Sequence, residues 1–403
     1  MPKPRLWIVS ELYYPEMTST GYYVTTIAEG LASDREVKII CGQPNYSSRG
    51  TVAPKHEIRN GVEIFRVMST RLDKNRVLNR VVNMITLGAS TFWYALRRFN
   101  RGDHVMVVTT PPSLPFNTAL AAMLKGSAYT LLVHDAYPEQ LIAVGAVSAR
   151  SPLVRSLHFA NRWLYKHASK IIVVGRDMKA LLEQKTHGLD IPVVCIPNWA
   201  ELEQVRPESR EGNLLLAKLG LEDKFVILSA GNIGRPTDIE TVVNCADQLR
   251  AEPDIHFLFV GDGAKLPWLT AEVERRSLSN ITFVGPMPRE KQTVFLNACD
   301  IGLVTLVPGM LGAAVPSRLY NILAAEKPVL ALADEGSEVA TVIQEENVGW
   351  VDSSRDPRRL KELILMIVSQ RQDLPAMGKR ARAAAEAKYS PEIAIEAYRE
   401  TLQ

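Results

Sequence analysis

Short apolar runs and amphipathic stretches alternate along the whole chain. The apolar runs are rich in Val, Ile and Leu and predict strands, while amphipathic stretches such as Gly21–Ala32 predict helices. In the first half the predicted strands are 5–10, 36–41, 61–67, 104–109, 129–133, 170–174 and 192–196. In the second half they are 225–230, 256–260, 281–284, 301–306, 329–332 and 350–351. This alternation favours an α/β fold with parallel sheets that helices cover on both faces, as in doubly wound, Rossmann-like domains.

The pattern restarts in the middle of the chain, so we expect two domains. A length of 403 residues is too great for one ordinary core. The polar, proline-flanked stretch 208–213 fits a linker between domains 1–200 and 208–388. Tyr389, Ser390 and Pro391 predict a break followed by a last helix at about 389–403, which we expect to pack back on the first domain. Two such domains place a ligand cleft between the carboxyl ends of their sheets.

Composition excludes several classes of function. The net charge of +3 gives no reason to expect nucleic-acid binding. The four cysteines are scattered, without metal or redox spacing, and the first residues lack a signal-peptide layout, so we expect a reduced, cytoplasmic compartment. No D-x-D motif occurs, so we expect no bound metal and no other cofactor.

Charge is uneven between residues 55 and 101, where ten basic residues stand against three acidic ones. Within this region Val81–Leu96 carries no charge, and Arg80, Arg97, Arg98 and Arg101 flank it. One interpretation is an amphipathic helix of the 71–101 region at an anionic membrane surface, which would make the protein peripheral on the inner face of the cytoplasmic membrane. The other is a buried helix of the first domain with basic ends.

The stretch 315–332, VPSRLYNILAAEKPVLAL, predicts a helix start suited to phosphate. Pro316 fits a first helical turn, and Ser317 can cap the helix. Arg318 adds a fixed charge that can fork onto phosphate oxygens at the helix N-terminus. The alternative is an ordinary capped helix with a surface arginine.

Two glycine turns follow strands of the second half, AGNIG at 230–234 and VGDG at 260–263. Such turns let a ligand approach the backbone. Neither is a dinucleotide or P-loop fingerprint, and each alone is a weak signal.

The order of the motifs resembles glycosyltransferase family 4, whose members are retaining enzymes of the two-domain B-type fold that use nucleotide sugars. In the second half the matching motifs are AGNIG, VGDG, NITFVGPMP, ACDIGLV and VPSRLYNILAAEKPV. In the first half they are ELYYPEMTSTGYYVTTIAEGLA, TTPPSLP, VHDAYPE and IPNWA. The PSRLYNILA form most resembles bacterial colanic-acid and exopolysaccharide enzymes.

The resemblance implies roles for matching residues. The residues expected to bind the donor nucleotide sugar are Gly21, Gly231, Asn232, Arg235, Lys265, Pro286, Met287, Ser317, Arg318 and Asn321. Ser317, Arg318 and Lys265 would hold the diphosphate, and the turn at 285–287 would meet the nucleobase. The residues expected at the reacting centre are His134, Asp135 and Arg318. His134 would contact the transferred sugar, although a packed strand-end histidine is the alternative.

The chain departs from the family where a pair of glutamates is usual, because Ala313 and Asn321 stand there. Asn321 can still bond ribose hydroxyls, whereas Ala313 cannot bond through its side chain. We therefore expect sugar transfer to a saccharide, such as one on polyprenyl diphosphate, with the donor unspecified. A nucleotide-sugar 2-epimerase and a non-catalytic nucleotide-sugar-binding protein remain the alternatives.

Overall fold

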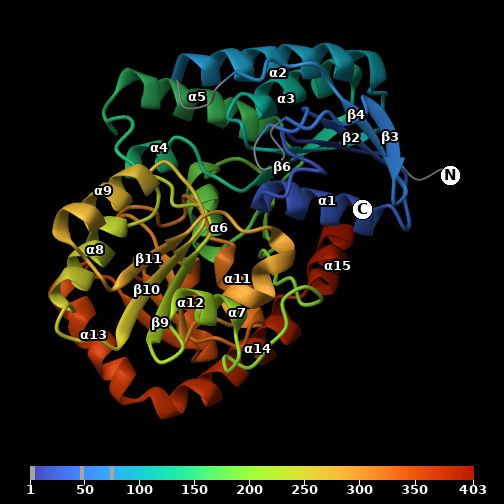
Figure 1. The fold of residues 1–403 in the computed structure, drawn as a ribbon. Coiled ribbons are helices and arrows are strands. Elements are labelled where there is room, and N and C mark those ends of the chain that lie inside the picture. The colour runs from blue at the N-terminus through green and yellow to red at the C-terminus, as the bar shows by residue number, and fades with distance from the viewer. Residues whose placement is uncertain (1–4, 46–49, 73–76) are drawn as a thin grey trace.

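A computed structural model describes residues 5–45, 50–72 and 77–403, which form two α/β domains with one sheet each (Figure 1). The first sheet has eight strands in the order β3-β4-β2-β1-β5-β6-β7-β8. Its strands are β1 Leu6–Val9, β2 Val37–Cys41, β3 His56–Arg59, β4 Val62–Arg66, β5 His104–Val108, β6 Ala128–Val133, β7 Lys170–Val173 and β8 Val193–Cys195. All neighbours are parallel except β3 and β4, which are antiparallel. The predicted fold class is confirmed.

The helices of the first domain lie on both faces of this sheet. They are α1 Ser19–Leu31, α2 Val77–Arg98, α3 Leu114–Lys125, α4 Glu139–Ala143, α5 Pro152–His167 and α6 Arg176–Lys185. Figure 1 shows α2, α3 and α5 above the sheet and α1 below it. Among the described residues, no helix is both long and apolar enough to cross a membrane.

The second domain has a six-stranded parallel sheet in the order β11-β10-β9-β12-β13-β14. Its strands are β9 Phe225–Ala230, β10 Ile255–Val260, β11 Ile281–Val284, β12 Ile301–Thr305, β13 Val329–Leu332 and β14 Gly349–Asp352. Its helices are α7 Leu214–Leu219, α8 Ile239–Gln248, α9 Leu266–Arg276, α10 Gln292–Leu296, α11 Arg318–Ala324, α12 Glu338–Glu346, α13 Pro357–Ser369 and α14 Leu374–Lys388. Buried side chains of α8, α9 and α13 form one apolar cluster on the sheet, and those of α11, α12 and α14 form another.

The chain first crosses between domains at Trp199 and Ala200. Trp199 belongs to the core of the first domain, and Ala200 belongs to that of the second. The stretch 208–213 is bound to the second domain, because the Glu208 N–H donates to Asn297 Oδ1 over 3.0 Å and Arg210 lies 3.5 Å from Asp300. The polar stretch 208–213 thus packs on the second domain, within the bounds 208–388 that the sequence predicts for that domain.

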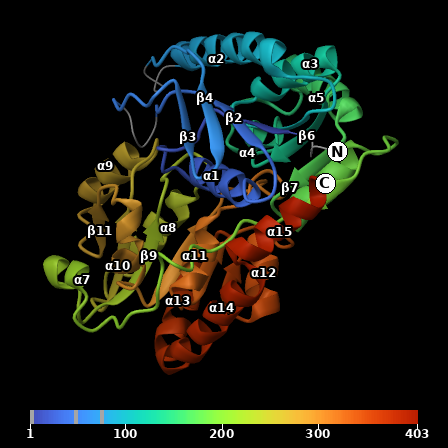
Figure 2. The ribbon, with the colours of Figure 1, turned by 90° about the vertical axis from the view of Figure 1, so that its right-hand side faces the viewer.

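The chain crosses back between α14 and the last helix, α15 (Pro391–Thr401), as Figure 2 shows. The Ser390 hydroxyl caps α15 by accepting from the Ile393 N–H over 3.4 Å. The helix α15 packs against α1, where a Cβ added to Gly30 would lie 2.8 Å from Ile395. Buried residues of α15 thus complete the core of the first domain.

Candidate active site

Arg318 is the first residue of α11 and contacts the glycine turn that follows β9. Its Nη2 donates to the carbonyl oxygen of Asn232 over 2.8 Å. Gly231 in that turn has φ +117°, and a Cβ added there would lie 3.5 Å from the guanidinium carbon. Burial lowers the pKa of Arg318 to about 10, which leaves the side chain charged at neutral pH. Among the described residues no carboxylate pairs with Arg318. A partly desolvated cation without a counter-ion favours an anionic ligand.

Ser317 does not cap α11, so this part of the prediction is wrong. Its backbone is helical, with φ −63° and ψ −17°, and its side chain makes no capping hydrogen bond. The hydroxyl instead lies 2.7 Å from Ser19 Oγ, at the first residue of α1. This contact brings the N-termini of two helices from different domains together. Because α11 has only seven residues, the charge at this point comes mainly from Arg318.

Gly21 lies in the first turn of α1, and the packing of the chain explains why it is a glycine. A Cβ at this position would come 2.4 Å from the carbonyl oxygen of Glu16. Its N–H donates to the Thr18 hydroxyl, which caps α1. The structure therefore places Gly21 near Ser19 and the facing α11, with its N–H already bonded.

The two glycine turns of the second domain pack backbone against backbone. A Cβ at Gly261 would lie 2.0 Å from the Gly231 oxygen, and one at Gly263 would lie 2.3 Å from the Ile233 oxygen. The turns are further joined by Ile233 N–H, which donates to the Asp262 oxygen over 2.8 Å. Close packing thus requires these glycines whether or not a ligand is bound.

The other predicted cations and the nucleobase turn lie around these glycine turns. Lys265 Nζ donates to Glu240 Oε2 and to the Thr237 oxygen, both over 2.8 Å. Lys265 is therefore paired with a carboxylate of the second domain, and its predicted role at the diphosphate stays a prediction. Arg235 is exposed, as is Pro286, while Met287 is partly buried.

His134 and Asp135 follow β6 at the carboxyl end of the first sheet. Nε2 of His134 is buried without a hydrogen-bond partner among the described residues, and burial lowers the pKa of this imidazole to about 4. Both carboxylate oxygens of Asp135 accept hydrogen bonds, one from Thr110 over 3.2 Å and one from Gln140 over 2.7 Å. Burial raises the pKa of Asp135. The site thus holds a neutral imidazole whose buried Nε2 has no hydrogen-bond partner among the described residues, next in the chain to a carboxyl group whose two oxygens are bonded.

The loop between β12 and α11 joins these two halves of the site. Asp135 forms a β-bridge with Ala314, and the Ala136 N–H donates to the Ala313 oxygen over 2.8 Å. Arg318 follows the same loop, four residues after Ala314. The structure therefore brings His134, Asp135, Ser317 and Arg318 to the contact between the two domains.

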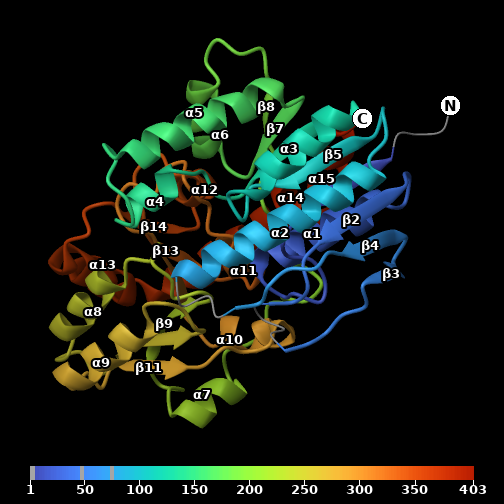
Figure 3. The same cartoon turned by 90° about the horizontal axis from the view of Figure 1, so that it is seen from above.

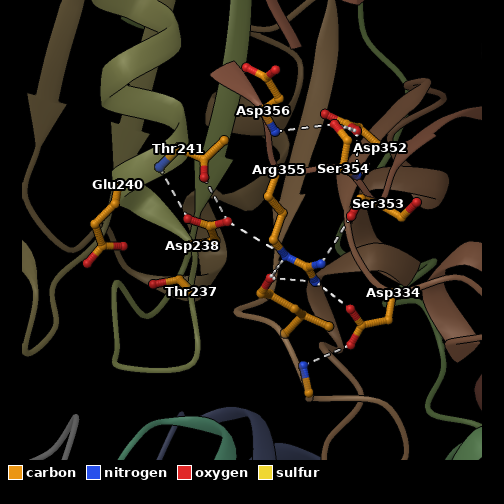
Figure 4. Close-up of polar contacts among 12 residues, drawn as sticks. Thr237, Asp238, Glu240, Thr241, Asp334, Asp352, Ser353, Ser354, Arg355 and Asp356 are labelled. Carbon is orange, nitrogen blue, oxygen red and sulfur yellow. Dashed lines mark hydrogen bonds and ion pairs between the residues drawn. The ribbon is translucent and has the colours of Figure 1, made fainter. Parts of the chain in front are cut away.

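Arg355 anchors this loop from within the second domain (Figure 4). Its Nη2 lies 2.8 Å from Asp334 Oδ1 and donates to the Leu306 oxygen over 3.3 Å. The second oxygen of Asp334 accepts from the Gly309 N–H over 3.1 Å. This pair was not predictable from the sequence, because an arginine and an aspartate after two separate strands form no motif.

Comparisons with known proteins identify the family. Residues 19–199 match the family model described as glycosyl transferase 4-like domain, and residues 214–384 match that of glycosyl transferases group 1. A relative named as a glycosyltransferase, WbjE of Pseudomonas aeruginosa, is 31% identical over 98% of this chain and 96% of its own length. The chain belongs to glycosyltransferase family 4. WcaI of Escherichia coli K12, named as a colanic acid biosynthesis glycosyl transferase, is 27% identical over 82% of this chain and 84% of its own length.

Solved structures show that this family 4 glycosyltransferase has the B-type fold. Sucrose-phosphate synthase from Thermosynechococcus elongatus superposes with a TM-score of 0.77 at 16% identity, over 99% of each chain. Anabaena HepE in complex with UDP-glucose superposes with a TM-score of 0.73 at 14% identity, also over 99% of each chain.

Asn321 occupies one of the two positions where the family usually has glutamate. Its side-chain amide is hydrogen-bonded to other residues of the glycosyltransferase. Its Nδ2 donates to Glu201 Oε1 over 2.7 Å and to Gln292 Oε1 over 2.8 Å. Its Oδ1 accepts from the Glu201 N–H over 2.9 Å. The amide therefore has only one acceptor lone pair left for a ligand. The role of the Glu201 carboxylate was not predictable from the sequence, because a single acidic residue after IPNWA gives no signal of its own.

Proposed function

We propose that this glycosyltransferase moves a sugar from a nucleoside-diphosphate sugar to a lipid-linked saccharide during assembly of a bacterial surface or exopolysaccharide. The observation that carries the proposal is Arg318, a partly buried cation with no carboxylate partner among the described residues, at the contact between the domains. A diphosphate supplies the missing negative charge. The UDP-glucose bound by HepE and the colanic acid pathway named for WcaI support the donor and the product class.

The reaction we propose retains the configuration of the anomeric carbon. The bond from that carbon to the diphosphate oxygen breaks, and the acceptor hydroxyl oxygen forms a bond on the same face. Arg318 stabilises the negative charge that develops on the leaving diphosphate. A diphosphate oxygen takes the proton of the acceptor hydroxyl, so the products are the glycoside and the nucleoside diphosphate.

The two residues after β6 support this front-face reaction in different ways. His134 is neutral, and its buried Nε2 has no partner among the described residues, so it is suited to hydrogen-bond a hydroxyl of the transferred sugar. Asp135 is a poor covalent nucleophile, because Thr110 and Gln140 already bond its two oxygens. We therefore assign Asp135 to holding the loop after β6 in place.

The test is release of nucleoside diphosphate from a panel of UDP- and GDP-sugars, with and without saccharide acceptors. Arg318→Ala should lower kcat/KM by on the order of a hundred-fold or more. Arg318→Lys should lose less activity than Arg318→Ala, because lysine keeps the positive charge but cannot make the bidentate hydrogen bonds of a guanidinium. Arg359→Ala, which removes an exposed arginine of α13, is the matched control.

Three results would count against the proposal. Equal kinetics for Arg318→Ala and Arg359→Ala would remove Arg318 from the site. A product of inverted anomeric configuration in the NMR spectrum would reject retention. Formation of an epimerised nucleotide sugar without acceptor would favour the 2-epimerase alternative.

A further inference from the structure

Three helices cover one face of the first sheet, and none contains an acidic residue. They are α2, α3 and α5, which Figure 3 shows side by side from above. Neighbouring contacts join α2 to α3 and α3 to α5. The basic residues in these helices are Arg80, Arg97, Arg98, Lys125, Arg155, Arg162 and Lys166. We refer to the outer side of these three helices as the basic face.

The basic face also exposes large apolar side chains. Phe159 of α5 is 81% exposed, and Leu78 of α2 is 74% exposed. The others in these helices are Val81, Ile85, Trp93, Leu120, Met123, Leu124 and Leu153. Apolar side chains gathered this way, among basic residues, mark an interaction surface more often than a free one.

We propose that the basic face binds an anionic lipid membrane. Its lysines and arginines complement acidic lipid head groups, and its apolar side chains enter the boundary between head groups and acyl chains. Trp93, which is 57% exposed on α2, is of the type enriched at that boundary. The protein would lie on the membrane, because none of its described helices is able to span one.

The composition of the basic face argues against a second copy of the chain or a nucleic acid as its binding partner. A second copy of the chain placed face to face would bring arginines against arginines, with no acidic residue in these helices to offset them. A nucleic acid would pair with the arginines but would leave Phe159, Leu78 and Ile85 against phosphates.

The helix α4, next to α5 along the chain, contacts the loop that leads to Arg318. The short helix α4 precedes α5 along the chain, and its Ala143 lies 3.9 Å from the Cβ position of Gly309 in the loop between β12 and α11. A saccharide on a membrane lipid would then approach Arg318 along this loop. The membrane proposal stands on the basic face alone, so its failure would leave the proposed sugar transfer untouched.

The test is co-sedimentation of the full chain with vesicles of phosphatidylcholine, with and without phosphatidylglycerol. Binding should require phosphatidylglycerol and should be lost near 1 M salt, where the screening length is about 3 Å. Replacing Arg155, Arg162 and Lys166 together by Gln should weaken binding by about five-fold for each residue. Phe159→Ser should weaken binding by about ten-fold.

Matched controls lie on the second domain. Lys218, Arg359 and Lys379 are exposed there and are replaced together by Gln, while Leu214→Ser removes an apolar side chain that is 80% exposed. Full vesicle binding by both controls is expected. Absence of binding at low salt, or equal losses for face and control variants, would overturn the proposal. A dimer in solution that the face variants dissociate would assign the surface to a second copy instead.

Discussion

Glu201 and Arg289 form a buried ion pair at the point where the chain first crosses from one domain to the other. Through this pair the crossing segment contacts both domains. Glu201, next to the crossing at Trp199 and Ala200, accepts from Nε of Arg289 over 2.6 Å and also from Nη2. The same guanidinium lies 3.9 Å from the ring centre of Tyr22 in α1 and donates to the Met17 oxygen over 3.3 Å. One arginine of the second domain therefore contacts both the crossing segment and the first domain.

We expect Glu201→Gln to lower the free energy of unfolding by about 3 kcal/mol, because it leaves the Arg289 guanidinium without its counter-charge. Guanidinium denaturation followed by tryptophan fluorescence measures the change. Glu203→Gln, which alters an exposed residue two positions away, should change it by less than about 0.5 kcal/mol. The double variant Glu201→Gln/Arg289→Gln should be more stable than Glu201→Gln alone. Equal stability of Glu201→Gln and Glu203→Gln would contradict this prediction.

An acidic residue at position 321, where the family usually has one, should lower the free energy of unfolding of this protein. Asn321→Asp would bring a second carboxylate to the position where Nδ2 now donates to Glu201 Oε1 over 2.7 Å. Loss of that hydrogen bond and repulsion of like charges should destabilise the fold by about 2–4 kcal/mol near pH 8. Glu201→Gln in the same chain should offset the loss, because it removes the like charge. A stability equal to that of the parent at pH 8 would refute the prediction.

The last helix should stabilise the first domain through one buried face. Ile395 of α15 is 8% exposed and packs on α1, whereas Ile393 is 46% exposed. We expect Ile395→Ala to cost about 2–4 kcal/mol and Ile393→Ala less than about 1 kcal/mol. Thermal unfolding of the two variants compares the same substitution two positions apart. Equal losses would mean that α15 does not pack as described.

Strands and helix starts were predictable from the sequence because they depend on local patterns. The strands Phe225–Ala230 and Ile281–Val284 have the predicted bounds, and α15 begins at the predicted Pro391. The edge strand β3 was missed, although Asn60–Gly61 gave a signal for it. Both residues have positive φ, 46° and 80°, as an Asn-Gly hairpin turn requires.

The polar partners of the site were not predictable, because they join residues far apart in the chain. Asn321 and Glu201 are 120 positions apart, and Ser19 and Ser317 are 298 apart. The sequence showed that Ser317 and Asn321 had polar groups to offer. The sequence did not show which groups would hydrogen-bond to these two side chains. In both cases the partner is a residue from a distant segment of the chain.

We expect turnover to continue without an added divalent metal ion. No group of three or more His, Cys, Asp or Glu side chains within residues 5–45, 50–72 and 77–403 is arranged to hold one. Arg318 supplies the charge that stabilises the leaving diphosphate in the proposed reaction. Release of nucleoside diphosphate should therefore be the same in EDTA as in magnesium. Loss of activity in EDTA that magnesium restores would show that a metal ion takes part.

The rate should not depend on the protonation of His134 near neutral pH. Burial lowers the pKa of this imidazole to about 4 from 6.5, so it stays neutral between pH 6 and pH 8. We expect the pH profile of kcat/KM for the donor to contain no step near pH 6.5 that is due to His134. A step there that is present in the parent and absent in His134→Asn would contradict the assignment of His134 as a neutral hydrogen-bonding group. Stability should behave differently, because the unfolded chain takes up this proton at about pH 6.5 and the folded one only near pH 4. The folded state should lose stability as pH falls through that window, and His134→Asn should reduce the slope.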